Sequence, residues 1–326
     1  MNGRAHGRRR TAWALLAAAW LASCERPPTT SAPVTRDQSQ PATDMALRNW
    51  VLQPPVMSEE RNAACPRLLS AAPNLTEVCC ALGLADHLVG RTRYCTYPPT
   101  VQSVRSIGAL NDLNVEVLLE IKPELVLIAG RSRAITERLA RLNCPFESLP
   151  DVSLADLYAT ITRLGELAGR PLTARRLADG IQADLAAVAR RYQPASPARV
   201  LLIFGALRDP PAAPTAAGPG SFYDDLLRLA GHVNVAAGTD RPFAPLGLEF
   251  IITADPDVII ELVPEATDRP GGEADARRVW GRVGPLRAVE RQRVHVLAGP
   301  EHYLLGPRLP QTMEALCQLI VGERHD

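Results

Sequence analysis

Two glutamates occupy equivalent positions in two similar stretches of this chain. Glu116 lies in VEVLLEIKPELVLI (115–128), and Glu249 lies in LEFIITADPDVIIE (248–261). In each stretch the glutamate begins a short apolar helix, followed by a Pro-acidic turn and an apolar strand, and the glutamates are 133 residues apart (249 − 116). A carboxylate in a first helical turn is stabilised by the helix dipole and can also bind a basic partner. The repeat predicts two similar halves, while chance similarity and a helix-capping role for the glutamates stay open.

Side chains that catalyse reactions or bind metals are present, but not in patterns that indicate a catalytic site. The chain contains no G-x-S-x-G, Walker, H-E-x-x-H or C-x-x-C motif, and its six histidines are scattered. A carboxylate pair of Asp151 and Glu301 is conceivable, yet nothing in the sequence fixes its geometry. We therefore expect a protein that is not an enzyme, with no cofactor and no dedicated zinc or manganese site.

The composition indicates a globular protein with two domains. The chain has 326 residues, and domains commonly contain ~150. Apolar residues make up 46% of the chain, enough for a sizeable core. The net charge of +1 lacks the basic excess that nucleic-acid-binding proteins usually show, so we expect no nucleic-acid partner.

The N-terminus is typical of an exported lipoprotein. A basic segment that ends in Arg10 precedes an apolar run over residues 11–22, which suits a signal sequence and is short for a membrane span. The run ends in Leu-Ala-Ser-Cys24, which resembles a bacterial lipobox. We predict a lipoprotein signal peptide over residues 1–23 and lipidation of Cys24. The protein would then be anchored to a membrane and face the periplasm or the cell exterior. A signal peptide cut elsewhere and an N-terminal membrane anchor are the alternatives.

Residues 24–64 are rich in Pro, Ser, Thr, Gln and Ala and show little apolar periodicity. This composition predicts a flexible tether, in which Trp50 to Leu52 are the residues that could dock locally. Export places the remaining cysteines in an oxidising compartment. We expect Cys79 and Cys80 to be buried apolar residues. The cysteines that could form disulfides are Cys65, Cys95, Cys144 and Cys317.

Strand and helix patterns alternate at short spacing on both sides of one long helix. The helix PLTARRLADGIQADLAAVARRY covers residues 171–192 and has apolar residues at helical spacing on one face. We predict an N-terminal α/β lobe over residues 65–168, a backbone helix over 169–193 and a C-terminal α/β lobe over 194–326. The expected fold class is α/β, with two Rossmann-like lobes of mostly parallel sheet joined by one long rigid α-helix.

A ligand of such a fold is expected beyond the carboxyl ends of the strands. The loops that follow the predicted strands are 91–99, 130–133, 150–152, 205–222, 240–247, 262–272 and 299–306.

Several longer motifs, in their order and spacing, resemble one family of transport proteins. They are RLLSAAPNLTEVCCALGLADHLVGRTRYCTYPP, IGALNDLNVEVLLEIKPELVLIAG, SFYDDLLRLAGHVNVAAG, GLEFIITADPDVII and LLGPRLPQTMEAL, and they cover most of residues 67–322. With the lipoprotein-like start, the chain resembles the Fe-siderophore/vitamin B12 family of ABC-transporter substrate-binding proteins. The resemblance implies a class III periplasmic binding protein-like fold, in which one rigid helix joins the lobes.

The resemblance also implies a ligand between the lobes. The segment YCTYPP (94–99) is most similar to the tyrosine-and-double-proline loop of cobalamin-binding members, which favours a corrinoid over a siderophore or haem. We expect Tyr94 to meet the ligand and at least one of the two tyrosines to be a packing residue. The further candidates are Arg131, Asp151, Phe222, Phe243, Glu301, His302 and Tyr303.

Two features qualify this site. Of the four tryptophans only Trp280 is a candidate for the cleft, so a corrin ring would rest on Tyr, Phe and aliphatic side chains. The neutral imidazole of His302 could be an axial ligand of cobalt or haem iron, and a hydrogen-bonding surface histidine is the alternative.

For Glu116 and Glu249 the resemblance implies docking onto arginines of the two permease subunits. The expected function is therefore capture of a corrinoid and its delivery to an ABC permease dimer with its ATPase subunits. A ferric-siderophore or haem receptor of the same family, and a transporter-independent ligand-sensing lipoprotein, are the alternatives. Because one stiff helix joins the lobes, only small closure is expected on ligand binding.

Overall fold

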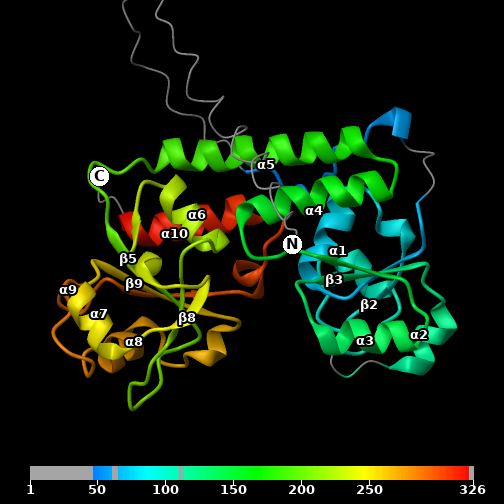
Figure 1. Cartoon of the computed structure of the whole chain (residues 1–326). Coiled ribbons are helices and arrows are strands. Elements are labelled where there is room, and N and C mark those ends of the chain that lie inside the picture. Colours follow the sequence, from blue (N-terminus) through cyan, green and yellow to red (C-terminus); the bar gives the residue numbers. More distant parts are fainter. Residues whose placement is uncertain (1–46, 61–64, 110–111, 113, 323–326) are drawn as a thin grey trace, which may run out of the picture. The chain divides into compact units, whose positions relative to one another are not determined.

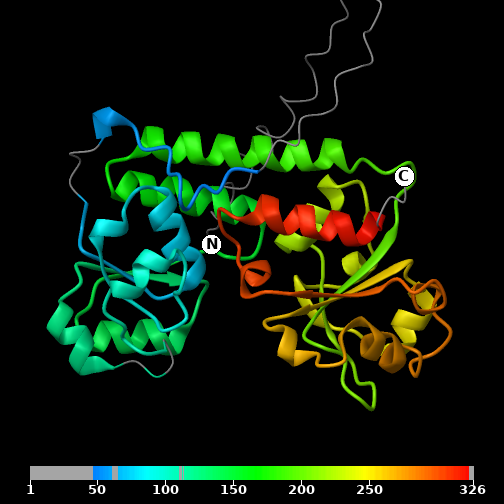
Figure 2. The ribbon, with the colours of Figure 1, turned by 180° about the vertical axis from the view of Figure 1, so that it is seen from behind.

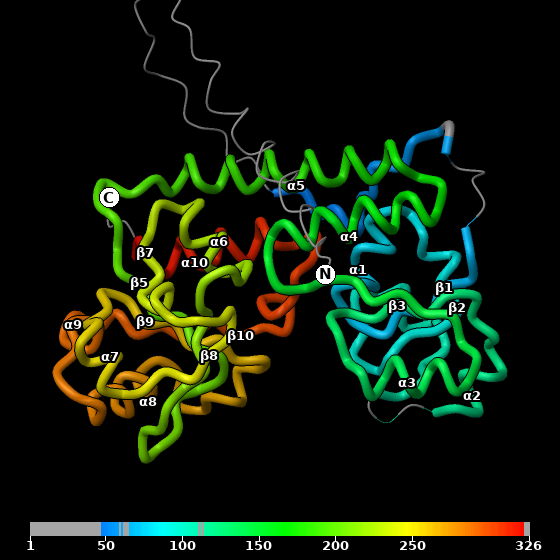
Figure 3. The backbone as a smooth tube through the Cα atoms, viewed as in Figure 1, coloured from blue at the N-terminus to red at the C-terminus, as the bar shows by residue number. Residues whose placement is uncertain are grey.

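The computed structural model describes residues 47–60, 65–109, 112 and 114–322. These residues form two β-sheets with their helices, and one long helix, α5 (Pro171–Arg191), runs past both (Figures 1 and 3). We call the sheet and helices before α5 the first lobe, and those after it the second lobe. The arrangement confirms the predicted α/β class with a long connecting helix. The predicted signal peptide and Cys24 lie outside the described residues.

The first sheet has the strand order β2-β1-β3-β4, and all of its strands are parallel. The strands are β1 (Leu68–Ser70), β2 (Leu88–Arg91), β3 (Leu125–Ala129) and β4 (Phe146–Leu149). Successive side chains point to opposite faces of a strand, so Leu68 and Leu69 belong to different apolar clusters. Helices cover both faces, which explains why the inner strand β3 is apolar along its whole length.

Four helices cover the first sheet. α1 (Pro73–Ala81) and α4 (Leu154–Leu167) pack on the face toward α5, whereas α2 (Val115–Ile121) and α3 (Arg133–Arg141) pack on the opposite face. Ser153 caps α4 through a reciprocal capping box with Asp156. α1 begins at Pro73, a residue suited to a first turn, and has no side-chain cap.

The second sheet has the order β10-β9-β5-β6-β8, and β7 pairs with β5 beside this path. The strands are β5 (Arg199–Phe204), β6 (Thr215–Ala217), β7 (Val233–Asn234), β8 (Phe243–Pro245), β9 (Val258–Val263) and β10 (Val294–Ala298). β6 and β8 are antiparallel to their neighbours and lie where the sequence predicted only loops. Each has three residues in Pro- and Gly-rich surroundings, too short for a strand period to be visible.

The helices of the second lobe are arranged as in the first. α6 (Phe222–Leu229) and α10 (Leu309–Val321) pack on the face toward α5. α7 (Leu248–Ala254), α8 (Gly272–Trp280) and α9 (Arg287–Glu290) pack on the opposite face. Short 3₁₀ helices lie between these elements: η1 (Ser58–Glu60), η2 (Ala85–His87), η3 (Pro99–Ser103), η4 (Val235–Gly238), η5 (Ala266–Asp268) and η6 (Pro300–Tyr303).

The internal repeat is visible in the structure. The bounds of α2 and α7 differ by the same 133 residues as the two glutamates (248 − 115 and 254 − 121). Both helices end in a left-handed C-cap, at Lys122 and at Asp255, directly before a proline. Leu118 and Ile251, at the same spacing, are the buried residues of the two helices. This agreement supports two similar halves over chance similarity.

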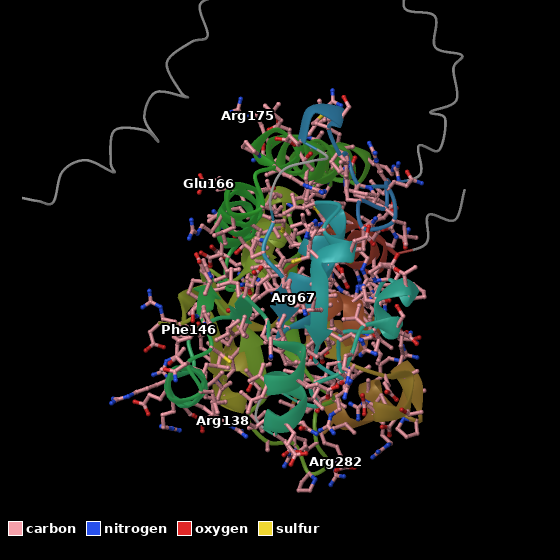
Figure 4. All side chains as sticks on the ribbon, turned by 90° about the vertical axis from the view of Figure 1, so that its right-hand side faces the viewer. Arg67, Arg138, Phe146, Glu166, Arg175 and Arg282 are labelled. Atoms are coloured by element: carbon pink, nitrogen blue, oxygen red, sulfur yellow. The ribbon has the colours of Figure 1, made fainter. Side chains whose placement is uncertain are left out.

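One apolar cluster extends through both lobes beneath α5. It contains side chains of α1 and α4 from the first lobe and of α6 and α10 from the second lobe, all packed around α5. The charged residues of the long helices face outwards, as Glu166 on α4 and Arg175 on α5 do in Figure 4. The lobes are therefore joined by packed apolar surface as well as by the chain.

Residues 47–60 pack along α5 (Figure 2), although the sequence indicated that they belong to the flexible tether. Trp50 and Val51 are buried in the shared cluster. The Trp50 ring lies so close to Gly180 of α5 that a Cβ atom there would be 2.3 Å from it. A glycine inside a helix is usually unfavourable, and this contact explains its presence. We call residues 47–60 the strap.

The cysteines of the described residues are free thiols, so the disulfides considered from the sequence are not seen there. Cys79 and Cys80 are buried in α1, as expected. Burial raises the pKa of Cys80 to about 12, and the nearby charge of Glu77 adds to this. Such a thiol is unreactive at neutral pH.

Candidate functional site

Two adjoining cavities lie where the carboxyl ends of the two sheets meet. One has a volume of about 240 Å³ and the other about 350 Å³, and Pro73, Tyr303 and Leu304 line both. First-lobe residues that follow β1 and β4, and second-lobe residues that follow β9 and β10, contribute to the walls. Ligands of open α/β sheets bind in this position. We therefore take the two cavities as the candidate site and call them together the cleft.

Aromatic rings of the second lobe line the larger cavity of the cleft. Phe204, the last residue of β5, lies in their middle: its ring centroid is 5.4 Å from those of Tyr223 and Phe243 and 5.9 Å from that of Tyr303. The rings meet edge-on or tilted, as aromatic side chains prefer. Phe222, at the start of α6, lines the same cavity. This wall suits a large, partly apolar ligand.

A buried ion pair between the lobes lines the smaller cavity. Arg308, directly before α10, donates to both carboxylate oxygens of Glu77 on α1, at 2.9 and 2.6 Å. The Glu77 side chain is 2% exposed and that of Arg308 is 18% exposed. Burial raises the pKa of Glu77 above its ordinary value, even though Arg308 acts to lower it. A bidentate pair of this kind fixes the two side chains in one geometry.

Tyr94 and Tyr97 both line the smaller cavity, but their surroundings differ. Tyr94 is 59% exposed, and the Arg93 guanidinium lies 5.2 Å from its ring centroid. The Tyr97 hydroxyl accepts a hydrogen bond of 2.6 Å from Asn49 Nδ2, and the Arg308 guanidinium lies 4.2 Å above its ring. Tyr97 is held by its neighbours, whereas Tyr94 is accessible to a ligand.

Two predicted carboxylates also reach the cleft. Asp151 follows β4 and lines the larger cavity, while Glu301 follows β10 and lines the smaller one. Burial raises the pKa of Asp151, and the nearby charge of Asp156 adds to the effect. The two carboxylates line different cavities, so the conceivable catalytic pair is not formed.

The structure brings six of the eight predicted ligand residues to the cleft: Tyr94, Asp151, Phe222, Phe243, Glu301 and Tyr303. Arg131 is exposed on the loop after β3 and lines neither cavity. His302 is also not among the lining residues. Its side chain is 12% exposed, its Nδ1 lies 3.2 Å from Thr312 Oγ1, and burial lowers its pKa. It is a structural histidine of the second lobe and not a ligand facing the cleft.

Sequence reasoning missed Glu77, Phe204, Tyr223 and Arg308. They lie inside apolar helix, strand or motif patterns, where a core role is the ordinary expectation. Only Phe204 carried a usable signal, because it is the last residue of a strand. Trp280, the one tryptophan that the sequence left as a candidate for the cleft, does not line it: Trp280 is fully buried, and its Nε1 donates to Glu261 within the second lobe.

Glu116 and Glu249 are exposed in the first turns of α2 and α7. Neither carboxylate has a hydrogen bond or an ion pair within the described residues, so the capping alternative is not seen. Asn114 caps α2 instead, and α7 begins without a side-chain cap. Both helices lie on the sheet faces opposite α5 (Figure 1). The two carboxylates are available to a partner.

Two other hollows that are larger than either cavity of the cleft lie away from the first lobe. One of about 710 Å³ lies beside His295 and Glu273, and one of about 370 Å³ lies at the amino ends of β5, β9 and β10. Neither is at the carboxyl end of a sheet, and no first-lobe residue lines either. They are weaker candidates than the cleft for these reasons.

Neither a metal-ligand cluster nor a membrane-spanning helix is present in the described residues. They hold no group of three or more His, Cys, Asp or Glu side chains that could bind a metal ion. Within the same residues, no helix combines the length and the apolar character that a membrane span requires.

A family model described as periplasmic binding protein matches residues 69–271. The chain belongs to this family. The match, with the relatives below, confirms the recognition of an ABC-transporter substrate-binding protein of the Fe-siderophore/vitamin B12 kind. The chain is 27% identical, over 260 residues, to an ABC transporter substrate-binding lipoprotein, YvrC, of Bacillus subtilis (strain 168), with 78% of this chain and 79% of the relative covered.

Two further comparisons name different ligands. The chain is 25% identical to the vitamin B12-binding protein of Photorhabdus laumondii, with 78% of this chain and 88% of the relative covered. The structure matches the periplasmic heme-binding protein RhuT of Roseiflexus sp. RS-1 in its apo form, with a TM-score of 0.65 and 26% identity. That match covers 78% of this chain and 98% of RhuT. The family is thus established, and its members differ in ligand.

Proposed function

We propose that this protein is the substrate-binding lipoprotein of an ABC importer and that it captures a corrinoid of the vitamin B12 type between its lobes. The observation that carries the proposal is the cleft, whose walls come from both lobes and combine aromatic rings with a few charged groups. The Tyr94 to Pro99 segment and the vitamin B12-binding relative support a corrinoid.

In this proposal the rings around Phe204 pack against the apolar surface of the corrinoid, and exposed Tyr94 contacts it from the first lobe. Asp151 and Glu301 accept hydrogen bonds from amide groups at the edge of the ligand. The raised pKa of Asp151 is consistent with a partly buried acceptor in an apolar surrounding. Arg308 is already paired with Glu77, so it shapes the cavity and offers little free charge.

Titration of the purified protein with cyanocobalamin, cobinamide, haemin and a ferric hydroxamate tests the ligand. We expect a corrinoid to bind saturably, as measured by quenching of the protein fluorescence. Phe204→Ala should weaken it about tenfold or more, because a buried aromatic contact is lost. Phe250→Ala, which removes an exposed phenylalanine on α7 outside the cleft, is the matched control. No saturable corrinoid binding at micromolar concentration would refute the corrinoid proposal.

Haem is the second candidate, and two observations favour it. RhuT, a heme-binding protein by name, has a similar structure at 26% identity. The exposed phenol of Tyr94 at the cleft is of a type that ligates haem iron. If haemin saturates the protein and corrinoids do not, Tyr94→Phe should change the visible spectrum of the haemin complex. Tyr97→Phe should leave that spectrum unchanged.

We further propose that Glu116 and Glu249 dock the two lobes onto a permease dimer. Their equal positions in the repeat suit a partner that offers the same basic surface twice. An exposed apolar side chain lies one turn after each glutamate, Leu119 on α2 and Ile252 on α7, again 133 residues apart (252 − 119). Each lobe therefore offers a carboxylate beside an apolar contact, a combination that interfaces use for orientation and affinity.

Binding of the protein to its importer in nanodiscs tests the docking. Glu116→Ala with Glu249→Ala should weaken the importer complex at least tenfold and leave ligand affinity unchanged. Glu166→Ala, an exposed glutamate on α4, should weaken neither. Unchanged importer affinity in the double variant would refute docking through these carboxylates and favour a receptor that works without a transporter.

The lipid anchor is a separate proposal that rests on the sequence around Cys24. Metabolic labelling with an alkyne fatty acid should mark the full-length protein and should not mark Cys24→Ala. Label that persists in the variant would place the modification elsewhere. The domain limits of 65–168, 169–193 and 194–326 stay a proposal as well.

A further inference from the structure

The strap, residues 47–60, is bound to α5 at both of its ends. At one end Glu60 accepts hydrogen bonds from the backbone N–H groups of Leu172 and Thr173, at 2.6 and 2.9 Å. The first turn of α5 has no side-chain cap from its own N-cap residue, so Glu60 fulfils this role. At the other end Trp50 Nε1 donates to Asp184 Oδ2 at 2.8 Å. The strap is thus fixed in register along the helix.

Beyond α5, the strap contacts each lobe beside the cleft. Asn49 Nδ2 donates to the Tyr97 hydroxyl of the first lobe at 2.6 Å. Gln311 Nε2 of α10, in the second lobe, donates to the Arg48 carbonyl at 3.1 Å. Neighbouring strap residues therefore connect to both lobes at the place where the lobes meet.

The contact with Tyr97 continues into the cleft. The Arg308 guanidinium lies over the Tyr97 ring at 4.2 Å, and Arg308 is paired with Glu77. All three side chains line the smaller cavity. A hydrogen bond at the far end of the Tyr97 ring restricts the ring that supports Arg308. The Asn49 side chain is itself held, because its Oδ1 accepts from Val51 N at 3.2 Å in a turn.

We propose that Asn49 is a positioning residue of the ligand cleft: through Tyr97 it holds Arg308 in place, and the strap braces the two lobes. The proposal rests on the proposed function, because it gives the strap a role in the cleft that takes the ligand. Asn49 itself does not line either cavity and acts through Tyr97. The alternative is a strap that only stabilises the fold by burying Trp50.

Variants of the full-length protein separate these roles. Asn49→Ala removes the bond to Tyr97, and Tyr97→Phe removes the same bond while keeping the ring. Asn49→Asp keeps side-chain oxygens that can accept hydrogen bonds from the Tyr97 hydroxyl and from the Val51 backbone N–H. It therefore serves as the conservative variant. Leu52→Ala, an exposed leucine in the same turn, is the matched control.

Two readouts are measured for each variant: the Kd for cyanocobalamin and for haemin, and the hydrogen-exchange rate of residues 91–104. We expect Asn49→Ala and Tyr97→Phe each to raise the Kd of whichever probe binds by about 3- to 10-fold, the effect of one net hydrogen bond. Both variants should also speed hydrogen exchange in residues 91–104. The double variant should be no worse than either single one. Asn49→Asp should restore both readouts, and Leu52→Ala should change neither.

The outcomes decide the proposal even when a variant is unstable or a probe does not bind. A lower unfolding temperature with unchanged Kd and unchanged exchange in residues 91–104 would reduce the strap to a stabilising element. If Asn49→Ala does not fold, the two single variants Tyr97→Phe and Asn49→Asp are compared instead, because the first removes the hydrogen bond and the second keeps it. If the wild type binds neither probe, the ligand proposal fails by itself. The hydrogen-exchange rates of residues 91–104 then still test the coupling of strap and cleft. A double variant that exchanges no faster than either single variant confirms the coupling, and additive effects overturn it.

Discussion

Replacement of Arg308 by methionine should destabilise this protein far more than the loss of a surface ion pair. The substitution leaves the Glu77 carboxylate, which is 2% exposed, without its bidentate partner. Removal of one member of a buried pair costs about 3–5 kcal/mol, because a buried charge is left uncompensated. Arg308 is 18% exposed, so water reaches the pair in part, and we expect a loss of about 3 kcal/mol.

Thermal unfolding followed by circular dichroism measures this loss. For a folded unit of this size each kcal/mol lowers the Tm by roughly 2–4 °C, so the expected decrease is roughly 6–12 °C. Arg163→Met is the matched control, because it breaks the Arg163–Glu147 pair, whose side chains are 45% and 24% exposed. That control should cost less than about 1 kcal/mol.

The pH dependence of the Arg308→Met variant gives an independent check of the cause. Burial already raises the pKa of Glu77 above 4.5, and loss of Arg308 removes the main lowering effect. A carboxyl group whose pKa is higher in the folded state binds protons more tightly there, so stability rises as the pH falls through that pKa. The deficit of the variant should therefore be largest near pH ~7 and shrink toward pH ~5.

A second substitution completes the test. Glu77→Leu combined with Arg308→Met leaves no buried charge, so the pair should recover most of the stability that Arg308→Met loses. A Tm decrease no larger than that of Arg163→Met would refute the reasoning. A deficit independent of pH would refute it as well, and so would a double variant as unstable as the single one.

Three further perturbations have definite expected outcomes. Arg269→Met should lower the free energy of unfolding by about 3 kcal/mol or more in urea titrations, because it leaves fully buried Glu261 without its bidentate partner; a loss below about 1 kcal/mol would contradict this. Gly180→Ala should displace the Trp50 ring and shift tryptophan emission to longer wavelength, since the added Cβ would lie 2.3 Å from the ring; unchanged emission would show that α5 yields instead. Small-angle scattering should show no measurable compaction when ligand is added, and a large decrease in the radius of gyration would refute rigid lobes.

The sequence predicted the elements that are long and periodic. The helix at 171–191 and the strands with continuous apolar residues follow directly from their patterns. The two short antiparallel strands β6 and β8 were missed, because three residues carry no period.

The candidate site was most directly predictable where a loop residue follows a strand. Tyr94, Asp151 and Glu301 were found in this way. Glu77 and Arg308 are 231 residues apart, and only the packing of α1 against the start of α10 brings them together. His302 was misjudged because its sequence position is in the loop, while its ring turns toward Thr312. The strap was read as tether because its apolar residues, Trp50 and Val51, are too few for a pattern.

The contacts between the lobes determine what the proposed importer can sense. Phe222 N donates to the Val152 carbonyl at 2.8 Å, and Leu154 N donates to Asp225 Oδ2 at 2.9 Å, so one backbone–backbone and one backbone–side-chain hydrogen bond join the lobes. The buried ion pair and the shared apolar cluster add to them. We expect lobes held in this way to keep the separation of α2 and α7 nearly constant when the cleft is filled. A permease that docks on Glu116 and Glu249, as proposed, would then meet the same two carboxylates in both states and would have to recognise the loaded protein through the ligand and the mouth of the cleft.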